Sequence, residues 1–216
     1  MDLPATTFRS KAQVSCGMQR RFTKFVEQPT RENYLAVRDA ILRQAPLKLM
    51  TTELAELSLL LEEGDFQTVL DRIDALPPSK ALSPRIHFLA AEAAELLGDT
   101  QAGEVERFLF VLCLKALLST GRGSESEPYV VCHAADEYDV LEALGLEPAG
   151  QELIESDGRV CDLLTCSDGR EVWFDVTALF RPSGAKKNAA KTPAATARQV
   201  PRKAKRRPVS VSRTRR

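Results

Sequence analysis

The chain has 216 residues, of which 44% are hydrophobic, and its formal net charge at pH 7 is zero. This length and composition suit one or two small domains with a buried core and exclude a chain too polar to fold. The charges are unevenly distributed: residues 181–216 contain thirteen Lys and Arg and no acid, which leaves 17 basic and 30 acidic side chains before them. We therefore expect an acidic body followed by a basic tail.

The sequence shows no export or membrane signal. The amino terminus lacks a basic segment followed by an apolar core, so a secretory signal is not expected. The longest apolar run, residues 108–118, is interrupted by Lys115 and is too short to span a bilayer. The five cysteines are odd in number and scattered, which is typical of reduced, buried thiols. We expect a cytoplasmic protein without membrane association.

Residues 1–17 are expected to be disordered, and helical periodicity dominates residues 18–120. A first pattern follows Pro29 and Thr30 and stops at Pro46. Further helices are predicted at 52–62, 66–76, 84–97 and 103–119. The last of these is apolar on nearly all sides, so we expect it to be the most buried.

Two Gly-Asp pairs divide these helices at the same spacing. Gly64-Asp65 and Gly98-Asp99 are 34 residues apart, and each pair lies between two helical patterns. This is the period of tetratricopeptide repeats, in which a tight turn joins the helices of each pair. The region resembles tetratricopeptide-like helical hairpins, although it covers fewer than three units. A generic helical bundle is the alternative.

Residues 121–180 predict a small α+β module after a linker at 121–128. We expect a strand at 129–133, a helix at 136–144 ended by Gly145 and Pro148, and a hairpin. The hairpin strands are residues 159–166 and 171–176, joined at Ser167-Asp168-Gly169. The overall expectation is an α+β protein, with helical hairpins first, this module second, and a disordered tail at 181–216.

This module resembles the carboxy-terminal part of a bacterial domain of unknown function. The matching segments are Gly121-Arg122-Gly123-Ser124, Tyr129-Val130-Val131, Glu137-Tyr138-Asp139-Val140-Leu141, Gly145-Leu146-Glu147-Pro148-Ala149-Gly150-Gln151 and Cys161-Asp162-Leu163-Leu164. The resemblance covers about a third of the chain, implies a fold, and implies no activity.

Four candidate sites compete with structural explanations. The Gly121-Arg122-Gly123 loop follows a helix instead of preceding one, so a hinge is favoured over a phosphate loop. Cys132, His133, Cys161 and Cys166 lack the close Cys spacing of zinc sites. A Cys–His nucleophile using His87 or His133 lacks an evident third group. Asp136, Glu137 and Asp139 are attributed to the helix dipole in preference to a cation site.

The basic tail is the one segment with a charge pattern of its own. It has almost no large apolar residue and cannot form a core, and no aromatic residue beyond Phe180 is available to stack on bases. Polyanion binding by counterion release is one interpretation, and a solubilising tail is the other. The candidate polyanion-binding residues are Lys186, Lys187, Arg202, Lys203, Lys205, Arg206 and Arg207.

These observations predict a non-enzymatic scaffold or adaptor that binds a protein or peptide on its helical surface. The alternative is a nucleic-acid or ribosome-associated protein that acts through its tail. An enzyme that uses the cleft between the two parts is a third class, with no catalytic residue assigned. No cofactor and no metal are expected, and the oligomeric state is left open.

Overall fold

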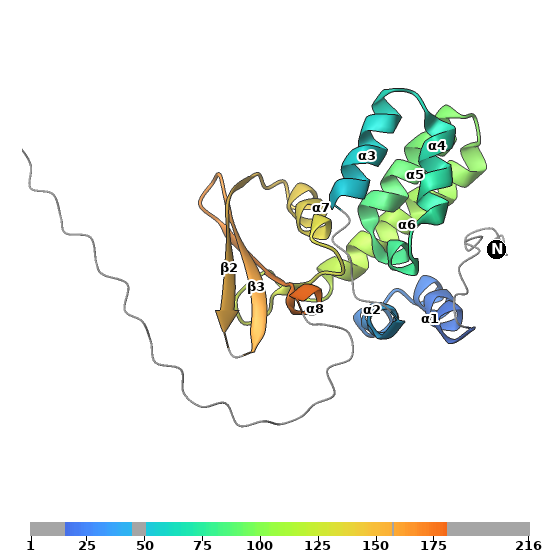
Figure 1. Cartoon of the computed structure of the whole chain (residues 1–216). Coiled ribbons are helices and arrows are strands. Elements are labelled where there is room, and N and C mark those ends of the chain that lie inside the picture. The colour runs from blue at the N-terminus through green and yellow to red at the C-terminus, as the bar shows by residue number, and fades with distance from the viewer. Residues whose placement is uncertain (1–15, 45–50, 157, 181–216) are drawn as a thin grey trace, which may run out of the picture. The chain divides into compact units, whose positions relative to one another are not determined.

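The computed structural model describes residues 16–44, 51–156 and 158–180. Within them the chain forms eight α-helices, one 3-10 helix and one four-stranded sheet (Figure 1). The α+β class expected from the sequence is confirmed. The basic tail and most of the expected amino-terminal segment lie outside the described residues.

The helical part contains three consecutive pairs of contacting helices. They are α1 (Cys16–Glu27) with α2 (Arg31–Gln44), α3 (Thr51–Glu62) with α4 (Phe66–Ala75), and α5 (Pro84–Leu96) with α6 (Thr100–Leu118). The four helices predicted between residues 52 and 119 are thus confirmed, with ends that differ by up to three residues. Helix α1 begins at Cys16, so the last two residues of the segment expected to be disordered are helical.

The two Gly-Asp pairs have the same structural role. Gly64 and Gly98 adopt positive φ angles of 81° and 87°, a conformation that glycine tolerates best. Asp65 then caps α4, where its side chain accepts a hydrogen bond from Thr68 N, and Asp99 caps α6 by accepting from Ala102 N. The 34-residue spacing therefore corresponds to two equivalent helix-turn-helix units.

Helix α5, and not α6, is the most buried helix, contrary to expectation. Eight of its 13 residues are buried, against six of 19 in α6. Helix α5 contacts α3, α4, α6 and α7 (Ala135–Ala143), and its alanines allow these close approaches. A short 3-10 helix, η2 (Pro78–Leu82), which was not predicted, connects α4 to α5.

The sheet has the strand order β1-β4-β3-β2. Its strands are β1 (Tyr129–Val130), β2 (Pro148–Ser156), β3 (Arg159–Cys166) and β4 (Glu171–Asp175), followed by the short helix α8 (Thr177–Phe180). Strand β1 runs parallel to β4, whereas β2, β3 and β4 pair antiparallel. The predicted β3–β4 hairpin is confirmed, with Leu163 opposite Trp173.

Two strand predictions were wrong in extent. Strand β1 covers two residues instead of five, because the chain turns away after Val130 to begin α7. Strand β2 was missed, because Pro148 and Gly150 were interpreted as a turn. Proline is tolerated at the first residue of an edge strand, and β2 is the edge strand of this sheet.

The hydrophobic core does not divide at residue 120, where the sequence suggested a domain boundary. One buried cluster joins α1, α2 and α6 to the sheet and α7, and a second joins α3, α4 and α5. The predicted linker is part of this structure: a Cβ on Gly121 would lie 2.2 Å from Pro128 O, and Trp173 N donates to Gly123 O. The Gly121-Arg122-Gly123 loop is therefore a packed connection, and its role as a hinge stays a prediction.

Candidate functional site

The most unusual chemistry in the described residues is a group of buried carboxyls on α7. Asp136, Glu137 and Asp139 are buried, and Asp162 on β3 is buried beside them. Carboxylates are rarely buried unless they are paired, because removing their charge from water is costly. Asp136 and Glu137 do lie in the first turn of α7, as the helix-dipole explanation requires. The burial of these two side chains and of Asp139 was not expected from the sequence.

Asp136 holds the loop that precedes α7. Its Oδ2 accepts hydrogen bonds from the backbone N–H groups of Cys132 and His133, both at 2.9 Å. Burial raises the pKa of Asp136 to about 7, although these two hydrogen bonds favour the charged form. The carboxylate therefore organises the turn between β1 and α7.

Glu137 is the most strongly perturbed carboxyl. It is 0% exposed, and burial together with the negative charge of Asp162 raises its pKa to about 9. Glu137 is therefore a neutral acid near pH 7. Its two oxygens are buried and have no partner at hydrogen-bond geometry among the described residues. Since the group is closed to solvent, the arrangement contributes pH-dependent stability and does not present an acid to a substrate.

Asp139 is the member of the group that has a basic partner. Its Oδ1 lies 2.6 Å from Nη2 of Arg85 on α5. Burial raises the pKa of Asp139 to about 6, and the charge of Arg85 acts in the opposite direction. Arg85 also binds Glu142 and lies over the ring of Phe88, 5.6 Å from its centroid. Helix α7 is thereby attached to the helical hairpin.

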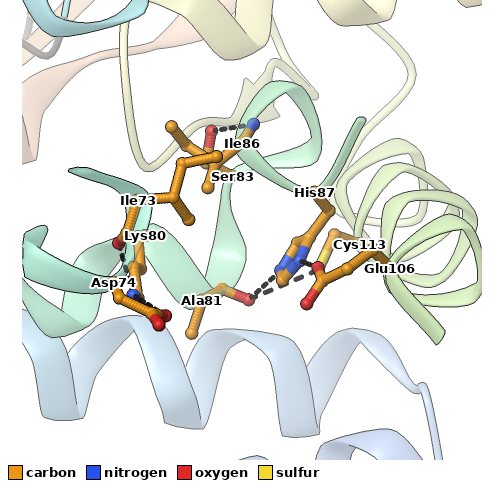
Figure 2. A network of polar contacts seen from close by, with 9 residues as sticks. All are labelled: Ile73, Asp74, Lys80, Ala81, Ser83, Ile86, His87, Glu106 and Cys113. Atoms are coloured by element: carbon orange, nitrogen blue, oxygen red, sulfur yellow. Dashed lines mark hydrogen bonds and ion pairs between the residues drawn. The ribbon is translucent and has the colours of Figure 1, made fainter. Parts of the chain in front are cut away.

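A second polar network surrounds η2 (Figure 2). The carbonyl oxygen of Ala81 accepts hydrogen bonds from His87 Nε2 at 3.2 Å and from the Cys113 thiol at 3.5 Å. Nδ1 of His87 lies 2.6 Å from Oε2 of Glu106. On the other side of η2, His133 Nε2 donates to Ser79 O at 3.1 Å. Two buried backbone carbonyls of this short helix, of Ser79 and Ala81, are thus bound by side chains from α6, α5 and the β1–α7 loop.

The sequence interpretation missed Glu106 and Cys113. They lie seven residues apart on α6, which places them on one face of the helix, and this spacing is the signal that could have revealed them. Together with His87 they bring a thiol, an imidazole and a carboxylate into one network, so the histidine does have a third group.

The geometry of this network does not favour a nucleophile. Burial alone would lower the pKa of His87, but its contacts with Cys113 and Glu106 raise it to about 10. The imidazole is therefore protonated near pH 7 and pairs with the carboxylate of Glu106. Cys113 is 0% exposed and bonds to a backbone carbonyl. The network is best explained as a buried ion pair that fixes η2.

The four residues considered for zinc are distributed over two parts of the sheet region. Cys132 and His133 precede α7, whereas Cys161 and Cys166 lie on β3. All four are buried, and burial raises the pKa of the Cys132 thiol. Among the residues that the structure describes, no group of three or more His, Cys, Asp and Glu side chains is placed to hold a metal ion.

The described surface carries exposed apolar side chains, among them two on α6. Phe108 is 49% exposed and Val111 is 42% exposed, three residues apart on one helix face. Tyr138 on α7 is also exposed. In the described ranges, no helix combines the length and apolar character needed to cross a membrane. The candidate polyanion-binding residues Lys186 to Arg207 lie outside the described residues.

No family model, curated protein or solved structure matches this chain. The resemblances to tetratricopeptide hairpins and to a bacterial domain of unknown function therefore stay predictions, and the site is interpreted from its own geometry.

Proposed function

We propose that this protein is a non-enzymatic cytoplasmic scaffold that binds a protein or peptide partner on its helical surface. The observation that carries the proposal is the exposed apolar pair Phe108 and Val111 on α6. Glu104 and Lys115 are exposed on the same stripe at helical spacing. An apolar centre with charged flanks is the arrangement typical of a protein-binding surface.

The polar networks support a structural, and not a catalytic, use of the buried groups. Arg85 and Asp139 attach α7 to α5, and His87 with Glu106 fixes η2. The second of these contacts attaches α6 to α5, while the stripe of Phe108 and Val111 on α6 faces solvent. A rigid helix with an exposed apolar stripe loses little conformational entropy when a partner binds.

The proposal is tested by affinity capture with quantitative mass spectrometry. The variant F108E/V111E should lose the captured partners, because two buried carboxylates would oppose an apolar contact. The matched control is A55E/L59E, which adds the same charges at exposed positions of α3. Capture through an apolar surface should persist at about 0.5 M salt, since screening acts mainly on charges. Identical capture by F108E/V111E and the unmodified chain would overturn the proposal.

The charge distribution favours one alternative function, polyanion binding by residues 181–216. This segment has thirteen basic and no acidic residues, whereas residues 1–180 carry an excess of acids and should be repelled by phosphates. The variant for the test replaces all seven candidate residues by Gln: Lys186, Lys187, Arg202, Lys203, Lys205, Arg206 and Arg207.

Anisotropy of labelled RNA and DNA is the measurement for this alternative. The unmodified chain should bind both with little sequence preference, and affinity should fall steeply with salt because counterions are released. The seven-Gln variant should bind more weakly, with a shallower salt dependence. Equal binding by both proteins, or binding by neither, would exclude this alternative.

A further inference from the structure

Strand β2 (Pro148–Ser156) leaves one side of the sheet open. The strand order β1-β4-β3-β2 places it at the edge, and β3 is its only strand neighbour among the described residues. An edge strand presents a row of backbone N–H and C=O groups that another extended chain can bind. Figure 1 shows β2 and β3 as the two long strands of the sheet.

The exposure of β2 differs from that of the other strands. Eight of its nine residues are exposed, and Ile154 is partly buried, whereas β3 is mainly buried. Leu153, near its middle, is 52% exposed. Edge strands in proteins are usually shorter than this, because a long open edge invites pairing. The length and exposure of β2 therefore indicate an edge that is available for pairing with another extended chain.

The charge around this edge identifies the kind of chain that would fit. Residues 121–180, which include the whole sheet, contain fourteen Asp and Glu and three Arg. The two charged residues of β2, Glu152 and Glu155, are both acidic and exposed. Because they are three residues apart in a strand, their side chains lie on opposite faces. A basic strand at this edge would meet a carboxylate on each face.

We propose that the open edge of β2 is a strand-addition site for an extended, lysine- or arginine-rich polypeptide segment of a partner protein. Backbone hydrogen bonds to β2 would supply the pairing, and Glu152 and Glu155 would select basic side chains. This proposal concerns a different surface from the α6 stripe and does not depend on it.

A second copy of this chain is the less suitable occupant. Pairing two β2 edges about a two-fold axis would bring four carboxylates onto one ribbon, and like charges across strands are destabilising.

The test uses the full-length chain and a short labelled peptide with the repeating sequence Lys-Lys-Val. In an extended strand this repeat places lysines on both faces. The peptide should bind, and its binding should slow hydrogen exchange of the amides in residues 148–156. The variant E152K/E155K should bind about tenfold more weakly, from two lost attractions of up to about 1 kcal/mol each. The control E62K/E63K makes the same charge change at two exposed positions, the last residue of α3 and the first of the α3–α4 turn, and should bind within about twofold.

A peptide with an N-methyl group on every residue separates strand addition from general charge attraction. It keeps every lysine but has no backbone N–H to donate along either edge, so it should not bind. Equal binding of the methylated peptide would overturn the proposal, as would an equal loss of affinity in E62K/E63K or unchanged exchange in residues 148–156.

Two further outcomes would assign the edge to another occupant and overturn the proposal. The first is self-association of the full-length chain that E152K/E155K abolishes, measured by sedimentation. The second is peptide binding only to a full-length variant whose thirteen basic residues in 181–216 are replaced by Gln. That result would make the chain's own segment the occupant, in place of a separate partner.

Discussion

Arg85 and Asp139 form an ion pair between two parts of the chain that the sequence pattern assigns to separate domains. Their Nη2 and Oδ1 atoms are 2.6 Å apart, and the Asp139 side chain is 2% exposed. One residue lies on α5 of a helical hairpin and the other on α7 beside the sheet. Helix α7 also contributes Val140 and Leu141 to the core cluster that joins helices to the sheet.

Replacing Arg85 by Met should therefore destabilise the whole described fold. Asp139 would remain buried without its cation, and we expect a loss of about 2 kcal/mol in the free energy of unfolding near neutral pH. The loss should be smaller at pH 5, where protonation removes the unpaired charge. Urea denaturation at both pH values measures this free energy of unfolding.

Arg72→Met is the control, because its pair with Glu56 is half exposed and contributes about 0–1 kcal/mol. Equal effects of the two variants would contradict the assigned role of Arg85.

The buried acid Glu137 should make stability fall as pH rises. Its pKa is about 9 in the folded chain, above the ordinary value of 4.5, so the folded state binds a proton that the unfolded state releases. Its contribution is full below about pH 4.5 and is lost as the pH rises through about 9, by up to about 1.4 kcal/mol per pH unit. His87 acts in the same direction above pH 6.5, because its folded pKa is about 10.

Glu137→Gln should flatten this dependence between pH 5 and pH 8.5, as measured by unfolding free energies across the range. The slope is the informative quantity, since a buried amide changes the absolute stability through its own unpaired groups. Glu63→Gln, at an exposed position of the α3–α4 turn, is the control and should leave the slope unchanged. An unaltered slope in Glu137→Gln would show that this carboxyl is ionised in the folded chain.

Phe174→Ala should cost about 3–5 kcal/mol, as expected for a large aromatic side chain removed from a core. Phe174 is 0% exposed and packs against Tyr129, with ring centroids 5.9 Å apart. Leu153→Ala on the exposed edge strand should change stability by about 0.5 kcal/mol or less. Thermal or urea unfolding distinguishes the two, and a small effect of Phe174→Ala would mean that β4 presents its other face to the core.

Gly121→Ala should destabilise the chain by about 1–3 kcal/mol. The added Cβ would lie 2.2 Å from Pro128 O and 2.6 Å from Glu127 O, and these backbone atoms cannot move without displacing β1. Gly150→Ala is the matched control, because a Cβ added there would meet no heavy atom within 4 Å outside its own chain neighbours. It should be neutral or slightly stabilising, as urea denaturation of both variants would measure. A neutral Gly121→Ala would show that the loop is free to move as a hinge.

Local features were predictable from the sequence because they depend on neighbouring residues. Gly64 and Gly98 permit positive φ angles, and Asp65 and Asp99 cap the helices that follow, so the hairpins could be located from one repeated dipeptide. The β3–β4 hairpin was found in the same way, from the Ser167-Asp168-Gly169 turn and the alternation of Val172 and Phe174 with Trp173 and Asp175. These signals lie within a few residues of the structure that they produce.

Strand β2 and the buried carboxyls could not be derived from the same kind of signal. The residues of β2 are exposed and include Pro148 and Gly150, so no apolar alternation marks the strand, and only pairing with β3 defines it. Asp136, Glu137 and Asp139 look like an ordinary solvated first turn of a helix. Their burial depends on Asp162 from β3 and Arg85 from α5, which approach only when the chain is folded.

The sequence by itself thus determined the helical hairpins, the β3–β4 hairpin and the separation of acidic from basic charge. The tertiary structure alone decided which charged side chains are buried, which strand edge is open, and that one of the two buried clusters joins helices to the sheet. The physical reason is the range of each interaction. Capping, turn geometry and periodicity act over a few residues, whereas burial and pKa depend on neighbours brought together from distant parts of the chain.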